Sequence, residues 1–221
     1  MDVAERRAPL NRDRVLRAAV ELADRTGIDT LSMRNLAQEL GVVPMALYKH
    51  VANKDELLDG MLDAVIASIG SAPGAPDGGW RSAVRSRILG ARQALLRHPW
   101  AWRLLDSRAD PTPAMLGYLD SVIGLFLAGG FTPDQTHHIV HALGTRLLGY
   151  TQDLFDDSRP AAPEARLALA RALADSHPSL AAMARAAAHD ESSVVGSGCD
   201  DQFEFEFALD LLLDGFDRLP H

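Results

Sequence analysis

Apolar residues recur at the spacing of one helix face near the start of the chain. The positions i, i+4, i+7 and i+8 are held by Val15, Ala19, Leu22 and Ala23. Residues at this spacing lie on the same side of an α-helix, so the pattern predicts an amphipathic helix over residues 11–25. Gly27 follows this helix and is placed to cap its C-terminus.

Two short helices are predicted next, separated by a tight turn. Ser32 is a favourable N-cap for a helix over residues 33–40, which Gly41 is placed to end. Pro44 suits the first turn of the following helix, over residues 44–50. The inward-facing residues of the pair are Leu36, Leu40, Leu47 and Val51.

A longer fourth helix begins after Asn53, which forms a capping box with Glu56. Its apolar stripe consists of Leu57, Leu58, Met61, Leu62, Val65, Ile66 and Ile69. The stripe predicts that this long helix has one apolar face.

The clearest interruption of helical spacing is SAPGAPDGG at residues 71–79. Its Pro and Gly residues cannot continue a helix, so it is either an inter-domain joint or an exposed bend. Beyond it, helices are expected over residues 80–97, 99–108, 113–128, 133–155, 163–189 (with a possible break at Pro178) and 202–219. No alternating strand pattern appears, and the fold class predicted is all-α, with domains at residues 1–70 and 71–221.

The charge balance changes what is expected of the surface. A net charge of -8 argues at first against DNA binding, because DNA-binding modules usually carry a basic footprint. The carboxylates, however, are concentrated in residues 190–217, which contain no Lys or Arg. The N-terminal segment is roughly neutral, so we expect a compact basic face within it.

Other compositional features bear on compartment and chemistry. No stretch approaches about 20 apolar residues, so no transmembrane helix is expected. The start of the chain lacks the apolar core of a signal peptide, and a cytoplasmic location is predicted. Cys199 is the only cysteine, which rules out an intramolecular disulfide and a cysteine-built zinc site.

The arrangement of short helices over residues 33–50 is typical of a helix-turn-helix. In such a motif the second helix lies in the major groove of DNA, and the first braces it on the backbone. The pair here would be Met33–Leu40 and Pro44–His50, joined through residues 41–43.

The segment LSMRNLAQELGVVPMALYKHVANKDELLDGM resembles the DNA-binding signature of the TetR family of transcriptional regulators. Together with the first helix, the resemblance covers roughly residues 11–60 without a gap. The residues that carry it are Leu36-Ala37, Leu40-Gly41-Val42, Leu47-Tyr48, His50-Val51, Asn53-Lys54 and Leu57-Leu58.

The resemblance implies contacts with a DNA operator. Arg34 would reach a base edge or a phosphate, and the Ser32 hydroxyl would donate to a phosphate. The exposed turn of the recognition helix would offer the bases only apolar contacts. Its residues are Pro44, Met45 and Ala46; the residues expected on the phosphate backbone are Tyr48, Lys49, His50 and Lys54. Alternatively, Arg34 and Lys49 are ordinary solvated charges.

The closing FEFALDLLLDGFDRL is similar to the end of the C-terminal domain of tetracycline-repressor-like proteins. Its apolar residues form two adjacent faces, one of Phe205, Leu209, Leu212 and Phe216, the other of Phe203, Phe207 and Leu211. The helix around residues 138–150 carries small residues that permit close packing. We infer a homodimer whose interface is a four-helix bundle of these two helices from each subunit, matching a pseudo-palindromic operator.

The resemblance also implies a C-terminal domain that binds a small-molecule effector. Candidate lining residues are Trp100, Trp102, Leu105, Phe126, His138 and Tyr150, although a core role explains the apolar ones equally well. His137 and His141 share a helix face beside His138, which leaves metal binding open. No carboxylate completes a site, so neither a metal nor a cofactor is predicted.

The function predicted is a transcriptional repressor that a small-molecule ligand releases from its operator. The alternatives are an activator or a ligand-independent regulator of the same fold. An enzyme is disfavoured because there is no Gly-rich phosphate loop, nucleophile elbow or metal-ligand array. A purely structural helical protein would give no reason for the pattern over residues 31–58.

Overall fold

The computed structural model describes residues 9–69, 79–108, 110–149, 168, 171–172, 176–179 and 201–219. These residues form helices and turns with no β-strand among them, which confirms the all-α prediction. The chain divides into two compact units, residues 1–136 and 137–221. The predicted helix over residues 163–189 and the end of the one over residues 133–155 lie largely outside the described residues.

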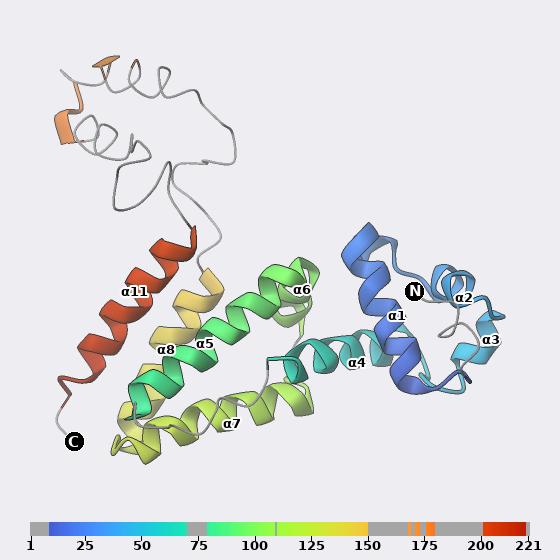
Figure 1. Ribbon diagram of the computed structural model, residues 1–221, viewed down its shortest axis with the longest axis horizontal. Helices are drawn as coiled ribbons and strands as arrows, with labels where there is room; N and C mark the ends of the chain where they lie inside the picture. Colours follow the sequence, from blue (N-terminus) through green and yellow to red (C-terminus); the bar gives the residue numbers. More distant parts are fainter. Residues whose placement is uncertain are drawn as a thin grey trace. The chain divides into compact units, whose positions relative to one another are not determined.

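The N-terminal helices are α1 (Arg12–Thr26), α2 (Met33–Leu40) and α3 (Pro44–Leu47), with a 3-10 turn, η2 (Ile28–Thr30), after α1 (Figure 1). The helix ends follow the local chemistry of the sequence. The Asn11 side chain accepts a hydrogen bond from Arg14 N–H, and Gly27 donates its N–H to the Ala23 carbonyl at a φ of 83°. The helix predicted over residues 44–50 ends earlier, at Leu47, and continues as a hydrogen-bonded turn.

Helix α4 (Lys54–Ala67) packs on α1 and closes this N-terminal group. Its capping box forms, with Asn53 Oδ1 accepting from Glu56 N–H at 2.8 Å. The Glu56 carboxylate reaches back one residue further than in the usual box and accepts from Ala52 N–H at 2.7 Å. Fully buried members of the shared core are Val15, Ala19, Leu36, Leu47, Leu57 and Met61.

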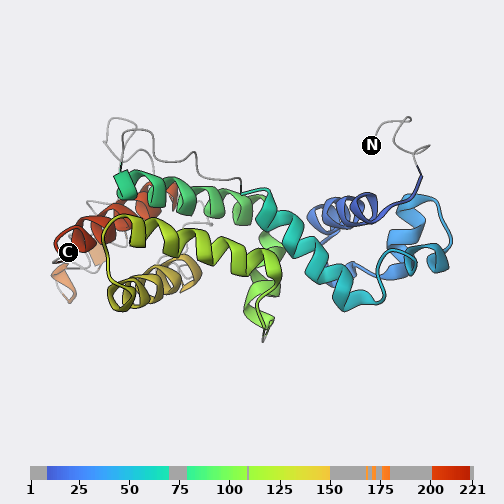
Figure 2. The same cartoon turned by 90° about the horizontal axis from the view of Figure 1, so that it is seen from below.

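Helices α5 (Gly79–Arg97), α6 (Pro99–Ser107) and α7 (Pro113–Ala128) follow α4, and Figure 2 shows α5 running beside α7. Three aromatic rings pack together where α5 begins and α7 ends. Trp80 lies 4.8 Å from Phe131 and 5.5 Å from Phe126 between ring centroids. These rings join the start of α5 to the end of α7.

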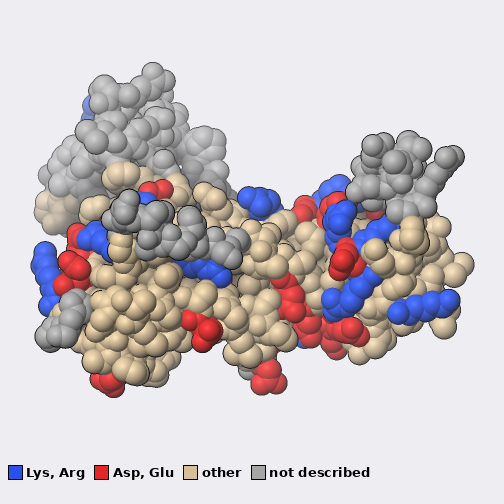
Figure 3. All heavy atoms as spheres, turned by 60° about the horizontal axis from the view of Figure 1, so that its bottom comes forward, with Lys and Arg blue, Asp and Glu red and all other residues tan. Residues whose placement is uncertain are grey.

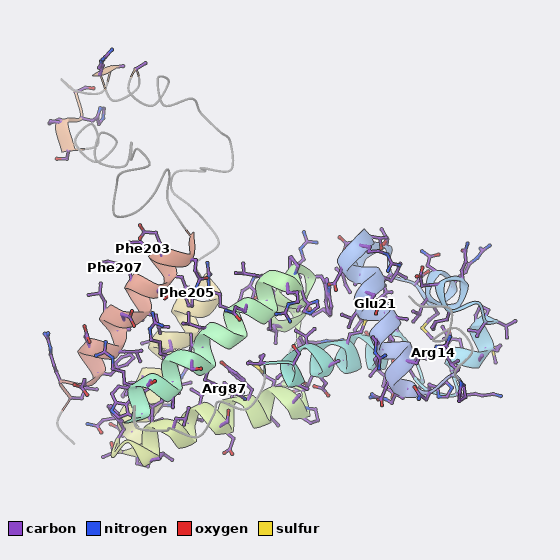
Figure 4. All side chains as sticks on the ribbon, in the orientation of Figure 1. Arg14, Glu21, Arg87, Phe203, Phe205 and Phe207 are labelled. Carbon is purple, nitrogen blue, oxygen red and sulfur yellow. The ribbon has the colours of Figure 1, made fainter. Side chains whose placement is uncertain are left out.

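The second unit contains most of α8 (Pro133–Gly149) and all of α11 (Asp201–Phe216). On α11, Phe205 points to the opposite side from Phe203 and Phe207 (Figure 4). The buried side of α11 consists of Phe205, Leu209 and Leu213. The sequence pattern had placed Leu212 and Phe216 on that side, whereas both are only half-buried and Leu213 is fully enclosed.

Candidate nucleic-acid interface

The turn between α2 and α3 is set by Gly41. Its φ of 67° and ψ of 34° are left-handed, a conformation that glycine adopts without steric cost. Gly41 N–H bonds to the Gln38 carbonyl at 3.2 Å, and Val42 N–H bonds to the Ala37 carbonyl at 2.9 Å. This Schellman-type ending stops α2 and redirects the chain into α3 within three residues.

The start of α2 is fixed by Ser32, as predicted. Its Oγ accepts a hydrogen bond from Asn35 N–H at 3.1 Å, which satisfies one free backbone donor of the first turn. The Asn35 side chain is held in turn by the Thr30 carbonyl at 3.0 Å. Because Oγ acts as an acceptor in the cap, the Ser32 hydroxyl proton stays available to a phosphate oxygen.

Three cations stand exposed around this motif. Within the described part of the chain, no side-chain partner is found for Arg34, Lys49 or Lys54. Other N-terminal arginines are paired: Arg25 lies 2.9 Å from Glu39. On the face drawn in Figure 3, Lys and Arg side chains lie beside Asp and Glu over the N-terminal helices, on the right. The N-terminal helices therefore carry surface charges of both signs on that face.

The start of α3 carries exposed apolar side chains. Met45 is 71% exposed and Val43 is 68% exposed, the highest values among the large apolar residues that the structure describes. Leu47, by contrast, is fully buried and anchors α3 to the core. The sequence pattern singled out Met45 but treated Val43 only as turn. Its position as the N-cap residue of α3 is the signal that would have identified it.

The remaining predicted DNA contacts lie around the same motif. Pro44 and Lys49 are exposed, Tyr48 is 45% exposed, and Ala46 and His50 are half-buried. Lys54 opens α4, whose first turn also holds the carboxylates of Asp55 and Glu56. These contacts with DNA stay predictions.

Helix α6 is tied to the N-terminal helices by a group of polar contacts, which we call the α6 clamp. Trp100 Nε1 donates to Asp24 Oδ1 at 2.6 Å, and His98 Nδ1 lies 2.9 Å from the same oxygen. Further along, Arg108 Nη2 lies 2.8 Å from Asp59 Oδ1 on α4. Arg103 and Asp29, both strongly exposed, add an ion pair at 3.1 Å.

The predicted effector contacts are spread over several elements. Trp100, Trp102 and Leu105 lie on α6, directly after the C-terminal end of α5. Phe126 packs on Trp80 at the opposite end of α5, whose 19 residues span roughly 28 Å. His138 is exposed on α8, and Tyr150 lies outside the described residues. The structure thus separates Phe126 from the α6 residues, and the effector site stays a prediction.

The α8 histidines are close to one another. Their ring centroids lie 4.6 Å apart for His137 and His141, and 5.3 Å apart for His137 and His138. In the described ranges, no group of three or more His, Cys, Asp or Glu residues is arranged to hold a metal ion. Nor does any helix there have the length and apolar character needed to cross a bilayer.

Two family models match the chain. Residues 15–61 match the model for bacterial regulatory proteins of the tetR family. Residues 72–219 match the model for the tetracyclin repressor-like C-terminal domain. Between them the two models cover most of the sequence.

Individual relatives agree with these models. The tetracycline repressor protein class D of Escherichia coli is 34% identical over 170 residues, covering 72% of this chain and 76% of that protein. The HTH-type transcriptional repressor DrrR1 of Streptomyces coeruleorubidus is 38% identical over 126 residues, covering 57% of this chain. The chain spans about half the length of DrrR1, 47%.

A solved structure extends the likeness to nearly the whole chain. Apo ActR from Streptomyces coelicolor superposes with a TM-score of 0.74 at 28% identity, covering 95% of each chain. ActR has also been solved in complex with actinorhodin, and that structure matches with a TM-score of 0.68, covering 95% of this chain and 97% of that one.

Proposed function

Because the chain belongs to the tetR family of bacterial regulatory proteins, we propose that it is a transcriptional repressor that a small molecule releases from its DNA operator. The observation that carries this proposal is the helix-turn-helix with exposed cations that lack intrachain partners in the described residues. Unpaired cations at such a motif favour phosphates, whose contacts supply most of the affinity for DNA. We assign residues 1–70 to DNA binding and residues 71–221 to effector binding and dimerisation.

The DNA contacts follow from the geometry of the motif. Arg34 on α2 and Lys49 after α3 are exposed, one before and one after the recognition turn along the chain, and Ser32 keeps a hydroxyl proton to donate. We assign phosphate contacts to Ser32, Tyr48, Lys49, His50 and Lys54, and base-edge or phosphate contact to Arg34. The turn Pro44–Ala46 faces the base edges.

A homodimer is proposed from the exposed side of α11. Phe203, Phe207 and Leu211 are 41%, 54% and 56% exposed and recur every four residues, so they form one apolar stripe. Such a stripe on a helix whose other side is already buried favours burial against a second protein surface. A second copy of the chain supplies the same stripe across a two-fold axis. The resulting dimer presents two recognition turns, one to each half-site of the operator.

Effector release is proposed to act through α6. The related ActR was solved in complex with actinorhodin, which supports a small-molecule site in this chain as well. We assign that site to the C-terminal domain. Here α6 follows α5 directly and is joined to α1 and α4 by the α6 clamp. A ligand that binds more tightly when α6 is displaced would favour that conformation and, through the α6 clamp, a shift of α1 and α4. The binding free energy for the operator would then weaken by the same coupling free energy.

The proposal is tested with labelled DNA from immediately upstream of the gene. In a fluorescence anisotropy titration at fixed salt, the chain is expected to bind this DNA more tightly than a scrambled duplex of equal length. A panel of small molecules is then screened for release. Failure to prefer the upstream DNA or any selected duplex would overturn DNA recognition. A promoter reporter measured with and without the gene separates repression from activation.

A further inference from the structure

The recognition turn presents no hydrogen-bonding side chain to DNA. Residues 42–47 read Val-Val-Pro-Met-Ala-Leu, an unbroken run of apolar side chains. The backbone adds little: Pro44 has no N–H, and Ala46 N–H is already bonded to the Val43 carbonyl at 2.9 Å. The side chains of the turn therefore cannot distinguish base pairs through the donor and acceptor pattern of the major groove.

Two apolar side chains of the recognition turn, which we call the apolar tip, are nonetheless accessible to a binding partner. Val43 and Met45 are 68% and 71% exposed, although the neighbouring Leu47 is fully buried. Arg34 on α2 and Lys49 after α3 belong to the same helix-turn-helix and are exposed, without a side-chain partner in the described ranges. A motif that carries both exposed apolar side chains and unpaired cations suits a DNA groove, in which base edges lie between two phosphate strands.

One base-edge feature of the major groove is apolar, the C5-methyl group of thymine. We propose that Val43 and Met45 are specificity-determining residues that select thymine by its methyl group. This inference rests on the proposed function, because it requires the turn to enter the major groove. It adds that recognition at the base positions that Val43 and Met45 contact depends on methyl burial rather than on hydrogen bonding.

The test separates the methyl group from the base pair. High-affinity duplexes are selected from a random-sequence pool with the full-length chain. Each thymidine of a selected half-site is then replaced by deoxyuridine, which keeps the pairing edge and removes only the methyl group. At one or more positions, replacement is expected to weaken binding about three- to tenfold, the loss from exposing one or two methyl-sized contacts.

Met45→Ala is the matching protein variant. It is expected to bind the thymidine duplex more weakly than the wild type. It should also lose most of the response to deoxyuridine at the base position that Met45 contacts. Where replacing thymine by cytosine weakens binding, 5-methylcytosine at that position restores the methyl group. This should recover part of the affinity for the wild type but not for Met45→Ala. Leu96→Ala, at an apolar residue 59% exposed on α5, is the control and should keep the wild-type response.

Three results overturn the inference. Deoxyuridine replacement without effect at every position shows that the methyl groups are not read. An unchanged deoxyuridine response in both Met45→Ala and Val43→Ala removes these side chains from recognition. A change in the oligomeric state of Met45→Ala without DNA assigns the tip to a protein contact instead. If the pool yields no bound DNA, the proposed function fails as well, and this outcome is distinct from the other three.

Discussion

The indole Nε1 of Trp100 donates a 2.6 Å hydrogen bond to Oδ1 of Asp24, although the two residues are 76 positions apart. The bond ties α6 to α1, and His98 Nδ1 shares the same carboxylate at 2.9 Å. Trp100 is only 5% exposed, so its N–H has little access to water as a substitute acceptor. An unpaired buried donor is costly, so breaking this contact is expected to destabilise the fold.

Trp100→Phe and Asp24→Ala are expected to be coupled. Each should lower the free energy of unfolding, Trp100→Phe by about 1.5–3 kcal/mol, the range for hydrogen bonds to charged groups. The double variant should lose less than the sum, with a coupling energy on the order of 1 kcal/mol in urea denaturation. Arg103→Ala, which breaks an exposed ion pair of the same clamp, should leave stability nearly unchanged. A coupling energy of zero would show that the Trp100–Asp24 hydrogen bond does not contribute to stability.

Arg34→Ala and Lys49→Ala should weaken operator binding without altering the fold. If Arg34 contacts a base through two hydrogen bonds, its loss costs about 1–3 kcal/mol of binding free energy. Loss of one phosphate contact at Lys49 should reduce, by about one, the slope of the logarithm of the binding constant against the logarithm of the salt concentration. Anisotropy titrations at several salt concentrations measure both quantities. Arg97→Ala is the matched control, because Arg97 is also exposed with no side-chain partner in the described chain, but lies at the end of α5. Equal losses of operator affinity in all three variants would show that the total positive charge of the chain, and not the position of each cation, determines the affinity.

The features that the sequence predicts correctly are those whose determining interactions are local. The Ser32 cap, the Gly41 stop and the Asn53 cap each depend on residues within five positions, so residue type and spacing were sufficient. The Trp100–Asp24 contact depends on how α6 folds back on α1, which no local pattern encodes. For that reason Trp100 was predicted as an effector contact, without its link to α1.

The side chains of α11 show a second limit. A helix advances about 100° per residue, so Leu212 and Leu213 lie on adjacent directions and both fit an apolar face. Packing selects Leu213, which is fully buried. The exposure of Val43 is similar: the sequence gives its apolar character, but only the turn geometry shows that it is 68% exposed.

Tyr118 should make stability fall at alkaline pH. Burial raises its pKa to about 12 from 10.0, with nearby Arg87 opposing the shift. Folding therefore favours the protonated phenol, and the unfolded chain releases the proton first as the pH rises. The stabilisation is complete below pH 10 and is lost between about pH 10 and 12, by about 3 kcal/mol at most.

Tyr118→Phe isolates this effect. Urea denaturation at several pH values should show a shallower alkaline decline for Tyr118→Phe than for the wild type. Tyr48→Phe serves as the control, since Tyr48 is 45% exposed, and its decline should follow the wild type. Parallel declines in all three proteins would mean that Tyr118 does not titrate in this range.

Gly129→Ala should be destabilising because no space exists for a β-carbon. A Cβ built at Gly129 would lie 2.6 Å from Trp80 Cγ and 2.7 Å from Trp80 Cβ, atoms too near the backbone to move aside easily. The expected loss is about 1–3 kcal/mol in thermal or chemical unfolding, as for other overpacked sites. Gly124→Ala, in α7 with nothing within 4 Å of the new Cβ, should instead be neutral or stabilising by up to about 1 kcal/mol. The opposite order would contradict the packing described for Trp80.

Phe207→Asp tests the proposed dimer. Phe207 is 54% exposed in the stripe on α11, so a charged replacement is tolerated by the single chain but would be buried without a partner at a dimer interface. Sedimentation velocity should show loss of the dimer, with the helical circular dichroism spectrum retained. Operator affinity should fall sharply as well, because two linked recognition turns bind far more tightly than one. Leu116→Asp is the matched control, since Leu116 is 53% exposed on α7 and lies outside the stripe; it should stay dimeric. A dimeric Phe207→Asp would move the interface away from this side of α11.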